Sequence, residues 1–176
     1  MKTNLPSVTV NNITIPNKDS VRYLNMTLDR RLTWKQHIID KSKQLKAKLK
    51  KFYWLIGRRS NLSTQSKITL YKTIIKPVYG IQLWGTASNS NIEILQRFHT
   101  KTLRSLIDAP WYVTNEAIHR DFKIPTVKEE ITKCSNRYII KVNNHRNPLI
   151  TKLLNTSDQI RRLRKHYPLD LSTKFG

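Results

Sequence analysis

The N-terminal stretch of the chain alternates between apolar and polar side chains in the manner of β-strands. Two short alternating runs, Ser7–Val10 and Ile13–Ile15, flank the pair Asn11-Asn12. Asparagine tolerates the positive φ that a two-residue hairpin turn requires, so this stretch predicts a β-hairpin. The apolar run Val21–Leu28 predicts a third strand. Three short strands make a weak sheet alone, so the rest of the chain has to complete the fold.

Beyond residue 29 the apolar positions follow the period of α-helices. A long helix is expected from about Trp34 to Arg59, because one of its faces is apolar. That face comprises Trp34, Ile38, Leu45, Leu49, Phe52 and Ile56. Ser63 can cap a second helix, which Pro77 should kink or end. The apolar positions of this second helix are Ile68, Tyr71, Ile75 and Val78.

Capping signals divide the second half of the chain. Ser90 and Glu93 form a potential capping box for a third helix, which should run to about Ile107. Thr114 can cap a short helix, and a second capping box opens another helix. This box pairs Thr126 with Glu129, and the apolar face behind it comprises Val127, Ile131, Cys134, Tyr138 and Val142. Residues 170–176 should be loose. The sequence therefore predicts a mainly α fold with a small N-terminal β element.

An excess of basic residues decides the expected class of partner. The chain of 176 residues has 33 Lys and Arg against 11 Asp and Glu, which gives a formal net charge of +22 and a pI of about 10.4. The segment Lys35–Arg59 is mostly basic on its polar face, with Asp40 as its acidic residue. Such a helix favours a polyanion, and the expected partner is RNA, DNA or an RNA–DNA hybrid.

The candidate nucleic-acid-binding residues follow this charge along the helices. On the first long helix, Lys43, Lys46 and Lys50 lie at helical spacing, with Lys48, Lys51, Arg58 and Arg59 near them. The third helix repeats the spacing with Arg97, Lys101 and Arg104, and the tail adds Arg161, Arg162, Arg164 and Lys165. Trp54 lies off the apolar stripe and could stack on bases, although aromatic residues at helical spacing usually belong to the core. Contacts of these basic residues to phosphates would be independent of sequence and weakened by salt.

Several other classes of function lack support in the sequence. The acidic residues are scattered, without the carboxylate spacing that two-metal phosphoryl transfer needs, so no catalytic or metal-binding residue is expected. The five histidines stand apart in the sequence, and Cys134 is expected to be a small buried hydrophobe. A single cysteine excludes an intramolecular disulfide. It favours a location in a reducing intracellular compartment, the nucleus or the cytoplasm. No apolar run is long enough to span a membrane, and no signal-peptide core is present, so no membrane partner is expected.

Three segments carry a resemblance to a known family. They are YLNMTLDRRLTWKQHI, LYKTIIKPVYGIQLWG and LQRFHTKTLRSLIDAPWYVTNEAIHRDFKIPTV. In their order and spacing, and over nearly the whole length of the chain, they resemble the carboxy-terminal part of the reverse transcriptase of jockey-type non-LTR retrotransposons.

The resemblance implies a division of the chain. Residues 1–32 would form the edge of the palm, with Val21–Leu28 as the primer-grip strand and with Arg22 and Tyr23 near nucleic acid. Asn25 stands where the family has glycine, so a backbone that needs close approach or an unusual φ at this position would be strained, although asparagine is the least unfavourable substitute. Residues 33–88 would form thumb-like helices, and residues 89–176 a helical connection with a basic tail.

The expected function follows from this division. The aspartates of the palm, which hold Mg²⁺ in the parent polymerase, would lie upstream, so the chain alone would bind nucleic acid without polymerising nucleotides and without a cofactor of its own. The missing palm and fingers are possible partners. Two alternatives remain open: a non-functional remnant of a transposable element, and a basic domain co-opted for general RNA binding or for a membrane surface.

Overall fold

A computed structural model describes residues 8–76, 80–151 and 170–171 of the chain. The fold is mainly α with a small N-terminal β element, as the sequence predicts. The expected break at Pro77, the apolar position Val78 and the basic cluster of residues 161–165 lie outside the described residues.

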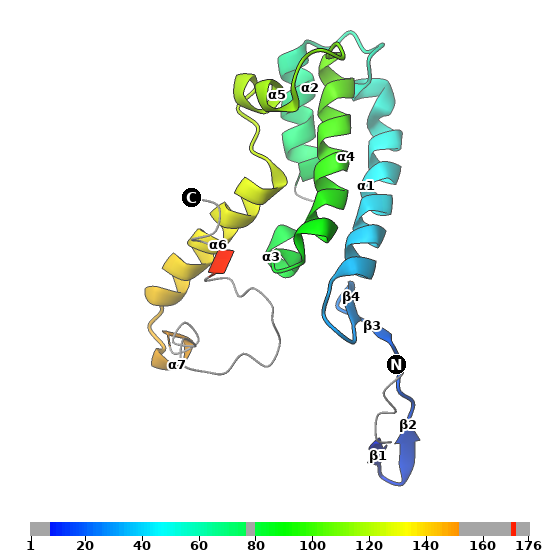
Figure 1. Cartoon of the computed structure of the whole chain (residues 1–176), viewed down its shortest axis with the longest axis vertical. Helices are drawn as coiled ribbons and strands as arrows, with labels where there is room; N and C mark the ends of the chain where they lie inside the picture. Colours follow the sequence, from blue (N-terminus) through cyan, green and yellow to red (C-terminus); the bar gives the residue numbers. More distant parts are fainter. Residues whose placement is uncertain (1–7, 77–79, 152–169, 172–176) are drawn as a thin grey trace.

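The predicted hairpin at the N-terminus is confirmed. Strand β1 (Val8–Val10) pairs antiparallel with β2 (Ile13–Ile15), and both turn residues have positive φ, 50° for Asn11 and 61° for Asn12. Two positive φ angles in sequence define the turn that matches the twist of a hairpin. Val8 pairs with Ile15 and Val10 with Ile13, so the four apolar side chains share one face, which is exposed. Figure 1 shows this hairpin at the end of the molecule, away from the helices.

The prediction of a single third strand over Val21–Leu28 is wrong, because the chain reverses direction in the middle of this segment. Strand β3 (Ser20–Tyr23) pairs with β4 (Met26–Asp29) through a turn at Leu24 and Asn25, with φ of 45° and 62°. The Nη2 of Arg22 donates a hydrogen bond to Oδ1 of Asn25 at 2.6 Å. After glycine, asparagine adopts left-handed backbone more easily than most residues do, which explains how Asn25 accommodates a φ of 62°. Leucine rarely occupies such a turn, and so the sequence concealed it.

The carboxylate of Asp29 fixes the start of the first long helix, α1 (Lys35–Ile56). Its oxygens accept hydrogen bonds from the backbone N–H of Thr33 at 3.0 Å and of Trp34 at 3.2 Å, and from the Thr33 hydroxyl. Partial burial raises the pKa of Asp29, but these hydrogen bonds outweigh burial and leave the pKa below its ordinary value. An anionic group at this end also suits the partial positive charge of a helix N-terminus.

Three helices form the bundle at the centre of the molecule (Figure 1). Helix α1 packs against α2 (Thr64–Leu70), which continues as a π-helical turn, η1 (Tyr71–Ile75), and against α4 (Asn89–Ile107); the short α3 (Ile81–Trp84) precedes α4. Helices α1 and α4 run parallel. At one end Nδ2 of Asn91 donates to the Thr33 carbonyl at 2.9 Å, and at the other Nε of Arg58 lies 2.6 Å from Oδ1 of Asp108.

The start of α4 differs from the prediction. The N-cap is Ser88, in extended conformation with φ −64° and ψ 151°, whereas Ser90 lies inside the helix. The predicted capping box of Ser90 and Glu93 is therefore wrong. Glu93 instead forms an ion pair with Nζ of Lys128 at 2.9 Å, which ties α4 to a later helix. The predicted cap of α2 is correct, because Oγ of Ser63 accepts from the backbone N–H of Ser66 at 3.1 Å.

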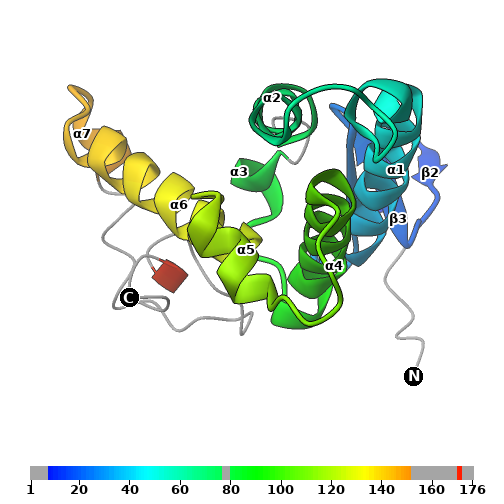
Figure 2. The same cartoon turned by 90° about the horizontal axis from the view of Figure 1, so that it is seen from above.

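In the described part of the chain, three further helices follow the bundle, and α6 runs away from it (Figure 2). They are α5 (Asn115–Asp121), α6 (Val127–Asn143) and α7 (Pro148–Thr151). The predicted cap of α5 is confirmed, since Oγ1 of Thr114 accepts from Ala117 N–H at 3.2 Å. On the predicted apolar face of α6, Val127, Ile131 and Val142 are buried, whereas Tyr138 is exposed. Leu171 is buried in the core, so the expectation of a loose end is wrong for this residue, whose apolar side chain packs inside.

The predicted capping box at the start of α6 is present in full. Thr126 Oγ1 accepts from the N–H of Glu129 at 3.2 Å, and Oε2 of Glu129 accepts from the N–H of Thr126 at 3.0 Å. Replacing Thr126 by alanine removes one acceptor for the helix N-terminus, and we expect a loss of about 1 kcal/mol in the free energy of unfolding. Urea denaturation checks this, with Thr132→Ala as the control, because the Thr132 hydroxyl donates to a carbonyl within the helix and caps nothing. Equal losses in both variants would contradict the role of the box.

Candidate nucleic-acid interface

The outer face of α1 carries the predicted lysine stripe. Lys43, Lys46 and Lys50 are exposed, and the buried residues Ile38 and Leu45 lie on another face of the helix. Within the described part of the chain, no ion pair joins these lysines to a carboxylate. Their ammonium groups are therefore available to an external anion. Lys51 is also exposed, whereas Lys48 is half-buried on the flank of the helix.

The aromatic residues separate into core and surface as the sequence suggested. Tyr71 and Trp84 are fully buried, which fits the usual place of aromatic residues in a core. Trp54, which continues the lysine stripe by one further turn, is 76% exposed, and Tyr53 beside it is exposed as well. The end of α1 thus offers an indole next to cationic side chains.

A polar cavity joins the β3–β4 hairpin to α1. It has a volume of about 290 Å³, and it brings the predicted residues Arg22 and Lys43 together with Lys41. Buried His37 also lines it, and its Nδ1 accepts from the N–H of Thr27 at 3.3 Å. Burial lowers the pKa of His37, and the positive charge of Lys41 lowers it further, against the opposing effect of Asp40. Tyr23, at the end of β3, is exposed.

Some of the predicted basic residues have partners within the molecule. Arg58 forms the exposed ion pair with Asp108 at the shared end of α1 and α4, while its neighbour Arg59 is exposed. The guanidinium of Arg104 donates to the carbonyls of Pro110 and Val113 at 2.6 and 2.7 Å. Arg104 therefore holds the turn after α4, in addition to the charge that it contributes to the surface.

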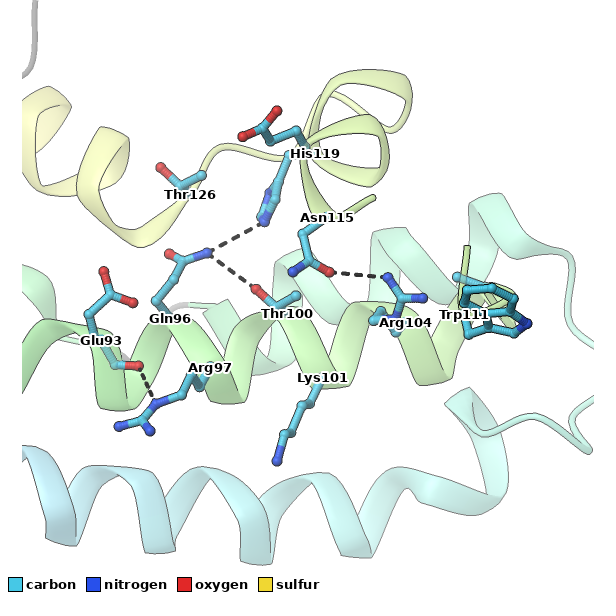
Figure 3. Close-up of a pocket in the computed structure, with 12 residues that line it drawn as sticks. Glu93, Gln96, Arg97, Thr100, Lys101, Arg104, Trp111, Asn115, His119 and Thr126 are labelled. Atoms are coloured by element: carbon cyan, nitrogen blue, oxygen red, sulfur yellow. Dashed lines mark hydrogen bonds between the residues drawn. The ribbon is translucent and has the colours of Figure 1, made fainter. Parts of the chain in front are cut away.

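A groove of about 800 Å³ lies between α4 and α5 (Figure 3). Arg97 and Lys101 are exposed on successive turns of α4 along this groove, as the helical spacing predicted. Arg97 also donates from Nε to the Glu93 carbonyl at 3.3 Å. Trp111, at the far end of the groove, was not among the residues that the sequence indicated. Its position in the pair Trp111-Tyr112, next to Pro110 and between two helices, was the available signal.

Two of the histidines, although far apart in the sequence, lie side by side in the fold. The rings of His99 on α4 and His119 on α5 stack with centroids 5.2 Å apart and an interplanar angle of 16°. Nδ1 of His99 is hydrogen-bonded to the Tyr71 hydroxyl at 2.5 Å, and Nδ1 of His119 lies 2.8 Å from the Ile124 carbonyl. Burial lowers the pKa of His99 to about 3, helped by the charges of His119 and Lys76 and opposed by a hydrogen bond to the Pro125 backbone. A neutral, buried His99 is a packing element that joins η1, α4 and α5.

Metal-binding and thiol chemistry have little support in the described part of the chain. In residues 8–76, 80–151 and 170–171, no group of three or more His, Cys, Asp or Glu side chains could hold a metal ion. Cys134 is half-buried and packs against the core, and burial raises the pKa of its thiol. None of the helices in these ranges is sufficiently long and apolar for a membrane span.

Known proteins similar to this chain are polymerases of mobile elements. A probable RNA-directed DNA polymerase from transposon X-element of Drosophila melanogaster is 41% identical over 171 residues, which are 96% of this chain and 19% of that protein. The RNA-directed DNA polymerase from mobile element jockey of the same species is 34% identical over 94% of this chain and 19% of its own length. A probable RNA-directed DNA polymerase from transposon BS is 32% identical over 82% of this chain and 16% of its own length.

The chain spans about a fifth of the length of these relatives. No protein-family model matches the sequence, and no solved structure matches the chain. The relatives confirm the resemblance that the three sequence segments indicated. The chain is homologous to a part of the RNA-directed DNA polymerases of jockey-type mobile elements.

Proposed function

We propose that this chain is the part of a reverse transcriptase that binds the template–primer duplex. It would bind independently of nucleotide sequence, and it would not itself catalyse the transfer of nucleotides. The observation that carries the proposal is the exposed stripe of Lys43, Lys46 and Lys50 on α1, which no carboxylate of the described residues neutralises. Duplex phosphates attract such a stripe, and each neutralised phosphate releases counterions. The relatives are RNA-directed DNA polymerases, which supports a nucleic acid as the partner.

The junction of the β3–β4 hairpin with α1 extends this surface. Arg22 and Lys43 line one cavity there, so a strand that follows the lysine stripe can also reach the hairpin. On the resemblance to reverse transcriptases, we assign residues 1–32 to a palm edge, residues 33–88 to a thumb and residues 89–176 to a connection. The bundle itself crosses the boundary at residue 88, since α4 packs with α1 and α2. Thumb and connection would then move as one body on the duplex. The carboxylates that bind Mg²⁺ for nucleotide transfer would belong to the remainder of the polymerase.

Exchanging Lys43, Lys46 and Lys50 for glutamine tests the proposal. We expect weaker binding to RNA–DNA hybrid and to duplex DNA of any sequence, because the lysines would bind phosphates. The slope of log affinity against log salt should fall by up to about 3, at about 0.9 for each phosphate that is no longer neutralised. Fluorescence anisotropy with labelled duplexes at several salt concentrations measures both quantities.

A charge-matched variant controls for the overall charge. Lys123, Lys133 and Lys141 are exposed on other parts of the surface, and their exchange for glutamine removes the same charge. This variant should keep most of the slope of the unmodified chain. Equal losses of slope in the two triple variants would show that binding follows net charge alone, and the proposed surface would then be wrong.

A further inference from the structure

Two aromatic side chains project from the surface between α4 and α5. Trp111 is 90% exposed and Tyr112 is 70% exposed. Their rings meet edge to face, with centroids 6.0 Å apart and an interplanar angle of 82°. Both side chains leave apolar area in water, where it adds nothing to the stability of the fold. Adjacent exposed aromatic residues indicate a contact surface for another molecule.

The turn that carries the two rings is held in place. The N–H of Val113 donates to the Pro110 carbonyl at 3.2 Å, so Trp111 and Tyr112 are the central residues of a hydrogen-bonded turn. The carbonyls of Pro110 and Val113 also accept from the guanidinium of Arg104, at 2.6 and 2.7 Å. A turn fixed by three hydrogen bonds presents its rings with little conformational entropy left to lose, which favours binding.

Basic side chains lead along α4 towards this turn. Figure 3 shows Arg97, Lys101 and Arg104 in order along the helix, with Trp111 beyond its end. From Arg97 to Arg104 the helix rises about 10 Å, at about 1.5 Å per residue. Of the carboxylates that line the same groove, Glu93 is paired with Lys128, and Glu116 lies on α5. The arrangement is a cationic path that ends at an aromatic surface.

This combination fits a single strand of nucleic acid better than a duplex. An exposed ring needs a flat partner with a free face, and an unpaired base offers one, whereas the bases within a duplex are covered on both faces by their neighbours. Phosphates of the same strand would lie along the basic path. An acidic peptide could follow the path but has no regular series of flat rings to place on Trp111.

We propose that the Pro110–Val113 turn is a stacking platform for an unpaired base of single-stranded DNA or RNA, whose backbone passes along Arg97 and Lys101. This proposal shares with the proposed function only the need for a nucleic acid. It concerns another surface and another form of the strand.

Replacing Trp111 by alanine tests the platform. The side chain is almost fully exposed, so the variant should fold, which its circular dichroism and melting temperature verify. We expect binding to a labelled single-stranded oligonucleotide to weaken about fivefold or more, and Trp111→Phe to recover most of the loss. Binding to a blunt-ended duplex should stay unchanged. The control is Tyr138→Ala, which removes an exposed aromatic ring on α6 and should leave both affinities unchanged.

An abasic oligonucleotide of the same length separates stacking from charge. It retains the phosphates but has no bases, so Trp111→Ala should no longer reduce its binding. Equal affinity of the unmodified chain and Trp111→Ala for the ordinary single strand would overturn the proposal, as would an equal loss on the abasic strand. If duplexes bind and single strands do not, only the platform fails. If neither binds at low salt, the proposed function fails as well.

Discussion

Replacing Leu45 by alanine should lower the free energy of unfolding by about 3–4 kcal/mol. Leu45 is fully buried on the face of α1 that packs against α2, η1 and α4. Its removal loses the transfer free energy of the side chain and leaves a cavity that rigid neighbouring helices fill only in part. Urea denaturation followed by circular dichroism measures the change, and an unaltered m-value would show that the unfolded state is the same.

Two variants on the same helix calibrate this result. Leu49 is only partly buried, so Leu49→Ala should cost distinctly less than Leu45→Ala. Lys46 is exposed, and Lys46→Ala should change stability by no more than about 0.5 kcal/mol. If Leu45→Ala cost as little as Lys46→Ala, the packing of α1 in the bundle would differ from the one described.

Acidification from pH 7 to pH 5 should destabilise the fold through His99. Burial holds the pKa of His99 at about 3 in the folded chain, whereas the ordinary value is 6.5. Below pH 6.5 the unfolded chain therefore binds a proton that the folded chain does not. Stability is lost as pH falls from 6.5 towards 3, by about 1.4 kcal/mol for each pH unit, which amounts to about 2 kcal/mol at pH 5. Urea denaturation at a series of pH values checks this.

The variant His99→Gln isolates the contribution of this residue. It should be less stable at pH 7, because the bond to Tyr71 and the packing against His119 change, but its stability should fall less steeply between pH 7 and 5. His37 has a lowered pKa and adds a dependence of the same sign, so some slope remains. His145→Gln is the control, since His145 is exposed, and it should keep the full slope. Identical pH profiles for His99→Gln and the unmodified chain would refute the assignment.

Most of the fold could be predicted because local signals and long-range packing agree. The apolar stripe of α1, the caps at Ser63 and Thr114 and the box of Thr126 with Glu129 depend on residues close in sequence, and all are present in the structure. The errors arose where a tertiary contact or an atypical turn residue decides the local structure. Glu93 pairs with Lys128 from α6 instead of capping its own helix, and the turn at Leu24 has no favourable residue in its first position.

The features of the candidate site also divide into those that the sequence could predict and those that it could not. Helical spacing was sufficient to place Lys43, Lys46 and Lys50 on an exposed stripe of α1. The stacking of His99 on His119 could not be inferred, because it depends on how α5 folds back on α4. The engagement of Arg104 with the turn at Pro110 was equally hidden, since spacing alone does not distinguish a basic side chain that binds phosphate from one that binds backbone carbonyls.

The parallel course of α1 and α4 has a kinetic consequence. The hydrogen bond between Asn91 and Thr33 joins residues that are 58 positions apart, and the ion pair between Arg58 and Asp108 spans 50 positions. Large loops must close before such contacts can form. The chain therefore loses conformational entropy before these contacts stabilise the fold. The bundle should therefore acquire its native topology more slowly than an up-and-down bundle of the same size, and newly synthesised chains will pass through a period in which the helices exist without their final neighbours.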